Sequence, residues 1–259
     1  MRGCVCPHPP LLVPQVGGDD LGAVLSTVKA MQKLASDVGE PETIVIVSPH
    51  TPGRANTYTI KTATVLHGDF AAFGCPQVRH EIDNDTELAA ALLAAAAASG
   101  VPLAPTDSPD LDHGVLVPLH FLRARHLVSL SIISDYEAHK MLGDLVRRCV
   151  ADLGRDVLFV ASGDMSHRLT RGGPYGYDAR GPQFDRRVVE LLAEGDFDAL
   201  LSIDAGLRSG AGECGLRSLI ALGAFLGDDA ARDPRVYSYE GPFGVGYLVA
   251  GFGLAERTE

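Results

Sequence analysis

The strongest constraint on the fold of this chain is an alternation between short apolar segments and longer segments with helical spacing. Residues 2–6, 43–47 and 156–160 are apolar at most positions. Runs of this length are typical of strands that are buried on both faces of a sheet. Further strands are expected over residues 57–65, 127–133, 236–239 and 246–251.

Segments with apolar residues every three or four positions separate these strands, as expected of helices that pack on a sheet. They cover residues 20–38, 84–98, 136–153, 182–194, 196–203 and 212–226. Strands alternating with helices predict an α/β fold with a mostly parallel or mixed central sheet flanked by helices. No linker-like composition interrupts the chain, so a single domain is expected over residues 1–259.

Histidines recur where the expected strands end. His8 follows the first strand, His50 follows the strand at 43–47, and His167 closes the small-residue turn after 156–160. His113 lies in a turn-like stretch before another apolar segment. In open α/β sheets, ligands bind outside the carboxyl ends of the strands. The four histidines are therefore expected to share one site at that edge.

Composition excludes several classes of protein. The net charge is −11 with a pI of about 5.2, and no basic stripe appears, which argues against nucleic-acid binding. No run approaches the length of a membrane span, and the N-terminus does not resemble a signal peptide. The five cysteines are an odd number and lack the spacing of a disulfide framework, which favours reduced thiols and a cytoplasmic location.

The common catalytic motifs are absent. The chain has no Gly-x-Gly-x-x-Gly after its first strand, no Walker A sequence, no Gly-x-Ser-x-Gly, no His-Glu-x-x-His and no paired Cys-x-x-Cys. Dispersed histidines, carboxylates and a cysteine remain. This set suits a divalent transition metal.

Five motifs occur in a specific order, and together they resemble the class III extradiol ring-cleavage dioxygenases of the LigB type and their Memo-like relatives. They are Pro7-His8-Pro9-Pro10-Leu11-Leu12, Ser48-Pro49-His50, Asp112-His113-Gly114, Ser162-Gly163-Asp164-Met165-Ser166-His167 and Gly212-Glu213-Cys214-Gly215. The resemblance spans almost the whole chain. It implies a non-haem Fe(II) ion; copper or zinc is the alternative if Cys214 is a ligand.

The resemblance also implies the roles of the histidines. His8 and His50 would be metal ligands, and His113 and His167 would act near the substrate as acid/base and oxygen-orienting groups. Asp164 is expected to orient His167 or to cap the local turn. Metal binding should survive the loss of His113 or of His167, whereas turnover should not.

The third ligand is open between Glu213 and Cys214. Ring-cleaving relatives carry a carboxylate or histidine near this position, and the Memo-like branch carries a cysteine followed by glycine. A thiolate favours Cu(I) or zinc, whereas a carboxylate suits Fe(II). Alternatively, Cys214 is only a small buried residue, and Glu213 only a favourable carboxylate in the first turn of a helix.

Three residues are candidates for the substrate pocket. Tyr175 and Tyr177 lie on a lid-like loop over residues 172–182, and Glu240 precedes a Gly-rich loop before the last strand. The remaining histidines are expected to be structural: His67, His80, His120, His126 and His139.

Two functions follow. The first is an Fe(II) extradiol dioxygenase that opens a catechol-like ring with O2. The second is a Memo-like redox protein that binds copper or iron without ring cleavage. A homo-oligomer or a small partner subunit is compatible with either function.

Overall fold

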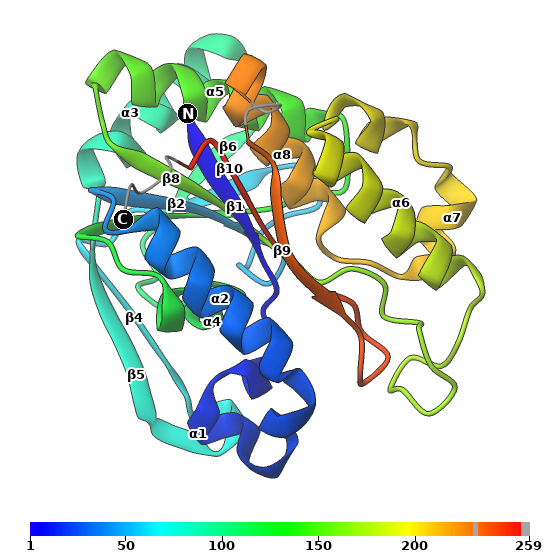
Figure 1. The fold of residues 1–259 in the computed structure, drawn as a ribbon. Helices are drawn as coiled ribbons and strands as arrows, with labels where there is room; N and C mark the ends of the chain where they lie inside the picture. Colours follow the sequence, from blue (N-terminus) through cyan, green and yellow to red (C-terminus); the bar gives the residue numbers. More distant parts are fainter. Residues whose placement is uncertain (230–232, 255–259) are drawn as a thin grey trace.

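A computed structural model describes residues 1–229 and 233–254 of the 259-residue chain. Its centre is a ten-stranded mixed sheet, with five adjacent parallel strands in the middle (Figure 1). In spatial order these are β5 (Cys75–Asn84), β7 (His126–Ser131), β2 (Thr43–Ser48), β8 (Val157–Ser162) and β1 (Arg2–Cys6). The parallel strands therefore end at one edge of the sheet, and their crossovers lie on its faces.

Antiparallel strands complete the sheet on both sides. Beyond β1 lie β10 (Tyr247–Phe252) and then β9 (Arg235–Glu240), each antiparallel to its neighbour. On the other side β4 (Val65–Phe70) forms a hairpin with β5. Strand β3 (Tyr58–Lys61) pairs with β7 and with β6 (Leu103–Thr106).

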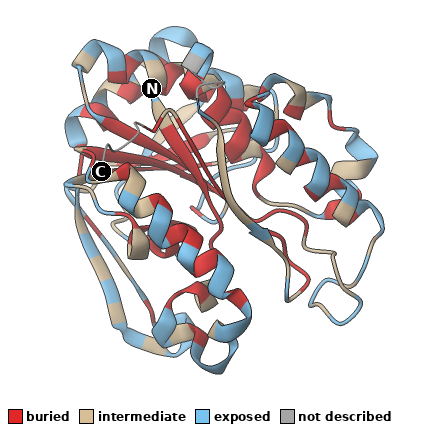
Figure 2. Ribbon diagram, in the orientation of Figure 1, coloured by how far each residue is buried: buried red, intermediate tan, exposed pale blue. Residues whose placement is uncertain are grey.

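Helices cover both faces of the sheet, and the strands between them are buried (Figures 1 and 2). One face carries α3 (Thr86–Ser99), α5 (Ala138–Leu153), α6 (Arg180–Glu194) and α8 (Leu216–Leu226), and the other carries α1 (Pro14–Gly17), α2 (Leu25–Val38) and α4 (His113–Phe121). Strand β2 shows why: Val45 and Val47 point into one apolar cluster, and Ile44 and Ile46 into the other. Successive side chains alternate between faces, so an all-apolar strand needs cover on both.

The predicted fold class, with one α/β domain and a mixed sheet flanked by helices, is confirmed. The predicted domain range of 1–259 extends beyond the described residues. Among the residues that the structure describes, no helix combines the length and apolar character needed to cross a membrane.

Several predicted boundaries are wrong. The strand expected over 57–65 is split between β3 and β4, and the expected helix at 196–203 is a 3₁₀ segment followed by α7 (Ala205–Ala211). The helix expected from residue 212 begins at Leu216 instead. Gly212 ends α7 with a φ of +61°, and the Glu213 side chain accepts a hydrogen bond from the Leu216 backbone N–H. Two helices therefore meet where one was expected.

Replacing Gly143 with alanine tests the packing of α5 against α8. A Cβ at this position would lie 2.1 Å from the carbonyl oxygen of Ala221 and 2.8 Å from the Cβ of Ala224. Alanine gains up to about 1 kcal/mol in helix propensity, but overpacking costs about 1–3 kcal/mol. We expect a net loss of about 1–2 kcal/mol in the free energy of unfolding, measured by urea denaturation. Gly172→Ala, with open space around it, is the control; equal stability of both variants would contradict the packing argument.

Candidate metal centre

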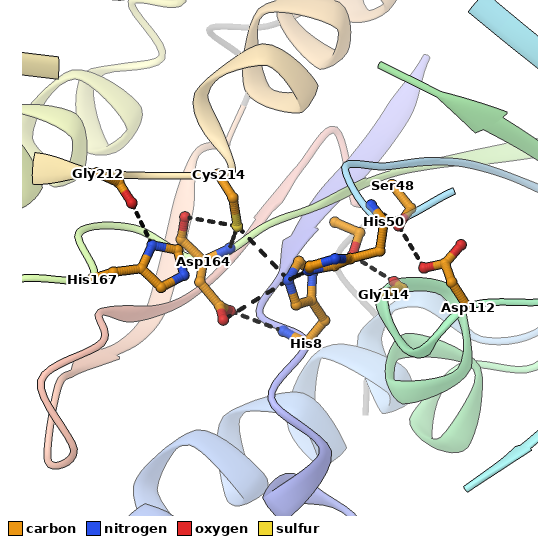
Figure 3. A network of polar contacts seen from close by, with 10 residues as sticks. His8, Ser48, His50, Asp112, Gly114, Asp164, His167, Gly212 and Cys214 are labelled. Carbon is orange, nitrogen blue, oxygen red and sulfur yellow. Dashed lines mark hydrogen bonds and ion pairs between the residues drawn. The ribbon is translucent and has the colours of Figure 1, made fainter. Parts of the chain in front are cut away.

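Three parallel strands end at the same level, and the residues that follow them form the site. In the pairing register, Cys6 lies opposite Ser162, and Val47 lies opposite Ala161. Strand β8 stands between β1 and β2, so the residues that follow all three strands meet at one edge of the sheet. His8, His50 and Asp164 come from these three strand ends (Figure 3).

The ring nitrogens of His8, His50 and His113 converge. The Nε2 atoms of His8 and His50 are 3.1 Å apart. The ring centroids are 4.1 Å apart for His50 and His113, and 5.5 Å apart for His8 and His113. One nitrogen from each of the three rings lies within 4.8 Å of the others, which is the spacing of a possible metal site. His113, the first residue of α4, reaches this group from outside the three strands.

Hydrogen bonds fix which nitrogen of His8 carries the proton. The Ser162 hydroxyl donates its single hydrogen to the carbonyl oxygen of Gly114, at 2.5 Å. Ser162 Oγ must therefore accept from His8 Nδ1, which lies 2.9 Å away. This assignment leaves the lone pair of His8 on Nε2, the atom that faces His50. An imidazole held this way is prepared to coordinate a cation.

Burial keeps these imidazoles neutral. The pKa of His8 lies well below its usual value because the ring is desolvated and faces His50, His113 and His167. Burial also lowers the pKa of His50, although Asp112 opposes the shift. The pKa of His113 falls to about 4, for the same reason and through the neighbouring His50. Neutral imidazole is the metal-binding form, so the donor set fits a divalent cation.

Cys214 lies beside the histidines. Its Sγ is 3.7 Å from His8 Nε2 and accepts a hydrogen bond from the Asp164 backbone N–H at 3.2 Å. Two glycines allow this approach, since a Cβ at Gly163 would lie 2.2 Å from the Cα of Gly215. Burial, followed by the charge of Asp164, raises the pKa of the thiol well above its usual value. A bound cation would oppose this shift and favour the thiolate.

Glu213 is directed away from the histidines. One carboxylate oxygen accepts a hydrogen bond from the Tyr136 hydroxyl at 2.9 Å, and the other accepts from the Leu216 backbone N–H at 2.6 Å. The side chain therefore caps α8 and anchors Tyr136. Of the two candidates for the third ligand, the structure brings Cys214 to the site and leaves Glu213 outside it.

Asp164 contacts His8, so the expectation that it orients His167 is wrong. Its Oδ1 accepts from the His8 backbone N–H at 3.0 Å, and its Oδ2 is 3.8 Å from His8 Nε2. Burial raises the pKa of Asp164 to about 7. His167 instead uses Nδ1 to donate to the Gly212 carbonyl oxygen at 2.5 Å, which leaves its Nε2 as an acceptor.

The three candidates for the substrate pocket lie in two different places. The exposed Tyr175 ring lies 5.1 Å from the His167 ring, between centroids, and Tyr177 is exposed on the same loop. Glu240 lies elsewhere: its Oε1 accepts hydrogen bonds from the backbone and hydroxyl of Thr27 at the start of α2. The structure therefore brings only Tyr175 into contact with one of the four candidate histidines.

Sequence reasoning did not assign a role to three residues that border the site. Asp112 accepts hydrogen bonds from Ser48 at 2.7 Å and Thr51 at 2.6 Å, and so holds the His50 loop against α4. Ser162 orients His8, as described above. Phe73, between β4 and β5, places its ring 5.5 Å from that of His113. The role of Asp112 could have been predicted, because it is part of the Asp112-His113-Gly114 motif. Phe73 belongs to no motif, so its place beside His113 could not.

The fold and the site together define an α/β protein with a histidine-rich centre at the carboxyl edge of its sheet that could hold a metal ion. A family described as the catalytic LigB subunit of aromatic ring-opening dioxygenase matches residues 3–250. The chain belongs to this family, and the predicted resemblance is confirmed. Membership supports a dioxygenase-type function and a bound metal.

Three relatives are between 26% and 34% identical to this chain. A Clostridium acetobutylicum protein whose name states no activity is 34% identical over 94% of this chain, which spans 55% of that protein's length. A 2,3-dihydroxyphenylpropionate/2,3-dihydroxicinnamic acid 1,2-dioxygenase from Burkholderia vietnamiensis is 26% identical, with 93% of each chain covered. A Mycolicibacterium smegmatis protein of the same name is 28% identical over 63% of this chain and 56% of its own length.

A solved structure supports the fold. The crystal structure of an uncharacterised Escherichia coli K12 protein superposes with a TM-score of 0.69 and covers 98% of this chain and 100% of its own. The sequences are 18% identical, so the likeness concerns the fold alone.

Ser162→Ala tests the support of His8. The change removes the acceptor of His8 Nδ1–H and frees the ring to rotate and change tautomer. We expect metal affinity to fall by roughly 10–100-fold, measured by competitive titration with Co(II) or Zn(II). Ser218→Ala is the matched control, because Ser218 is also buried but bonds to the Val47 carbonyl oxygen. Unchanged affinity in Ser162→Ala would show that the hydroxyl does not hold the ring.

Proposed function

We propose that this protein is an Fe(II)-dependent extradiol dioxygenase that opens a catechol-like aromatic ring with O2. The observation that carries the proposal is the convergence of the neutral imidazoles of His8, His50 and His113 at the carboxyl edge of the sheet. Two relatives are named as dioxygenases of 2,3-dihydroxyphenyl substrates, which supports the catechol class.

His8, His50 and Cys214 are the proposed metal ligands. Both histidines follow rigid strand ends, and Cys214 reaches His8 from the loop before α8. When bound, iron supplies O2 activation and Lewis acidity at the substrate hydroxyls. Three protein ligands leave positions for substrate and O2, which is why His113 and His167 are assigned to the chemistry.

His113 and His167 are the proposed acid/base groups. Burial lowers the pKa of both, so each ring can accept a phenolic proton at neutral pH. His167 is oriented for this role because Gly212 holds its Nδ1–H and leaves Nε2 free. The Tyr175 ring borders His167 and is a proposed part of the substrate pocket, together with Tyr177 on the same loop.

The division between metal ligands and acid/base groups predicts two classes of variant. His8→Ala and His50→Ala should lose iron and activity together, because each removes a ligand. His113→Ala and His167→Ala should keep the metal and lose turnover by about 10²–10⁴-fold. Protein purified without oxygen and loaded with Fe(II) would be assayed for metal by mass spectrometry and for a yellow ring-opened product from a catechol panel.

His67→Ala is the control for this series, because His67 is half-exposed on β4. It should match the wild type in both measurements. Activity that persists in both His8→Ala and His50→Ala would refute the proposal. Loss of metal from His113→Ala as complete as from His8→Ala would make His113 a ligand and close the coordination that an oxygenase needs open.

A Memo-like redox protein without ring cleavage is the second candidate. Cys214 favours it, because Sγ lies near His8 while Glu213 is occupied elsewhere. A thiolate with two imidazoles suits Cu(I). The free state of all five cysteines supports a reducing, cytoplasmic location for either candidate. A homo-oligomer or a small partner subunit stays a prediction.

The metal retained on purification and the presence of a ring-opened product separate the two candidates, and X-ray absorption at the metal edge shows whether sulfur is a ligand. We expect a sulfur scatterer that disappears in Cys214→Ser and persists in Glu213→Gln, the matched neighbour. Copper retained on purification, with sulfur bound and no ring-opened product, would establish the redox candidate. An iron site with only nitrogen and oxygen neighbours would exclude Cys214 as a ligand.

A further inference from the structure

Tyr247, the first residue of β10, lies at the edge of the sheet that carries the candidate metal centre. Strand β10 runs antiparallel to β1, and Val5 lies opposite Ala250 (Figure 1). The same register, continued from Val5 to His8 on one strand and back from Ala250 on the other, brings Tyr247 beside His8. Opposite residues of an antiparallel pair point to the same face of the sheet, so these two side chains are neighbours.

Backbone hydrogen bonds fix the residue before Tyr247 to the loop that follows β8. Gly246 accepts a hydrogen bond from the Met165 N–H at 2.8 Å and donates one to the Ser166 carbonyl oxygen at 2.8 Å. The same loop carries Asp164, whose carboxylate accepts from the backbone just after β1. The start of β10 therefore belongs to the group of strand ends that forms the site.

The Tyr247 hydroxyl has no hydrogen-bond partner among the residues that the structure describes. Its side chain is nevertheless buried, with 2% of the residue exposed. The hydroxyl of Tyr58 also lacks a partner, but that oxygen is fully enclosed in the core, whereas the Tyr247 oxygen retains some accessible surface. Buried tyrosine hydroxyls usually have a partner. This hydroxyl is therefore placed to receive its partner from a bound molecule.

Two carboxylates act on the Tyr247 hydroxyl, those of Asp164 and Glu240. Glu240 is already engaged, because its Oε1 accepts from the backbone and hydroxyl of Thr27. Asp164 Oδ2 accepts no hydrogen bond within the described part of the chain, and it lies 3.8 Å from His8 Nε2. Burial, followed by the charges of Asp164 and Glu240, raises the pKa of Tyr247. The phenol therefore stays protonated and can donate to an oxygen beside His8.

We propose that the Tyr247 hydroxyl donates a hydrogen bond to a ring oxygen of the catechol-like substrate and stabilises that oxygen as a phenolate. The inference rests on the proposed function and deepens it, because it assigns the group that holds the ionised substrate beside His8. A hydrogen bond to a charged oxygen is stronger than one to a neutral hydroxyl, so the contact favours ionisation of the ring.

The proton that the substrate loses goes to a histidine and not to Tyr247. It passes from the phenolic oxygen to the neutral imidazole of His113 or His167, which are the proposed acid/base groups. Tyr247 keeps its own proton, and no electron is transferred in this step. His113 and His167 thus remove the proton, and Tyr247 stabilises the charge that is left on the oxygen.

Binding of a coloured substrate analogue tests this contact without turnover. Iron-loaded protein kept free of oxygen would be titrated with 4-nitrocatechol, whose visible spectrum reports both binding and ionisation of the ring. We expect Tyr247→Phe to bind the analogue roughly 10–100-fold more weakly than the wild type, because a hydrogen bond to a charged oxygen is lost. The pH at which the bound ring ionises should rise by roughly 1–2 units, which a purely structural role would not produce.

Tyr58→Phe is the matched control, because it removes another buried and unpartnered hydroxyl from the opposite face of the sheet. It should bind and ionise the analogue as the wild type does. Tyr247→Phe should keep its full iron content by mass spectrometry and its fold by circular dichroism. A folded Tyr247→Phe that loses iron, or that binds and ionises the analogue like the wild type, would overturn the inference.

The wild type alone gives a second check. Its bound 4-nitrocatechol should ionise at a lower pH than the free compound, because the bound phenolate is stabilised. Equal pH values for the bound and the free ring would overturn the inference, whatever the behaviour of the variants.

Kinetics separate this inference from the proposed function. With catechol as substrate, Tyr247→Phe should raise KM by about 10-fold or more, and the acidic limb of its kcat–pH profile should move to higher pH. Ring opening with both quantities unchanged would refute the role of Tyr247 and retain the dioxygenase. A protein that opens no ring, but whose affinity for 4-nitrocatechol falls in Tyr247→Phe, would refute the dioxygenase and retain the contact.

Discussion

The hydrogen-bond register of β1, β8 and β2 is the constraint on which the site depends. Cys6 pairs with Ser162, and Val47 with Ala161, so the three strands end at one level. A slip of one residue would turn every side chain of a strand to the opposite face. The burial of both faces forbids such a slip, because each apolar cluster draws on alternate residues of the same strands. The apolar core thereby sets the positions of His8 and His50.

The centre itself opposes stability. It gathers desolvated imidazoles, a thiol and a carboxylate at the edge of an apolar sheet. Burial lowers the pKa of His8 and raises the pKa values of Asp164 and Cys214, so in each case it favours the neutral form. The neighbouring polar groups limit this cost by satisfying the atoms that do not face the site. Ser162 takes the Nδ1–H of His8, and Gly212 takes that of His167. Groups placed at this cost are common at functional sites.

The strand ends were predictable from the sequence because a short all-apolar run has few interpretations, and parallel strands share an edge. Those two facts were enough to bring His8, His50 and Asp164 together. Cys214 and Glu213 could not be separated in the same way, since adjacent residues at a helix start point in different directions. The amide of Leu216 decides the outcome by drawing the Glu213 carboxylate to itself. Which partner Asp164 or Glu240 would meet likewise depends on distant segments.

The hairpin of β4 and β5 was missed for a physical reason. Its residues are mostly half-exposed or exposed, so the sequence lacks the apolar signal that marks the central strands. In the described residues the hairpin meets β7 through two residue pairs, at Asp83 and Asn84, and it buries Leu66 and Phe70 in one of the two apolar clusters. Its far end nevertheless brings Phe73 against His113.

The tip of this hairpin, residues 71–74, is exposed and can therefore change in length and sequence without disturbing the strands that hold the imidazoles. This tip is one wall of the site, and the register of β1, β8 and β2 does not depend on it. A change of this wall therefore alters the shape of the space in front of His113 while the imidazoles keep their positions. The shape of the space and the arrangement of the imidazoles are thus set by separate parts of the chain.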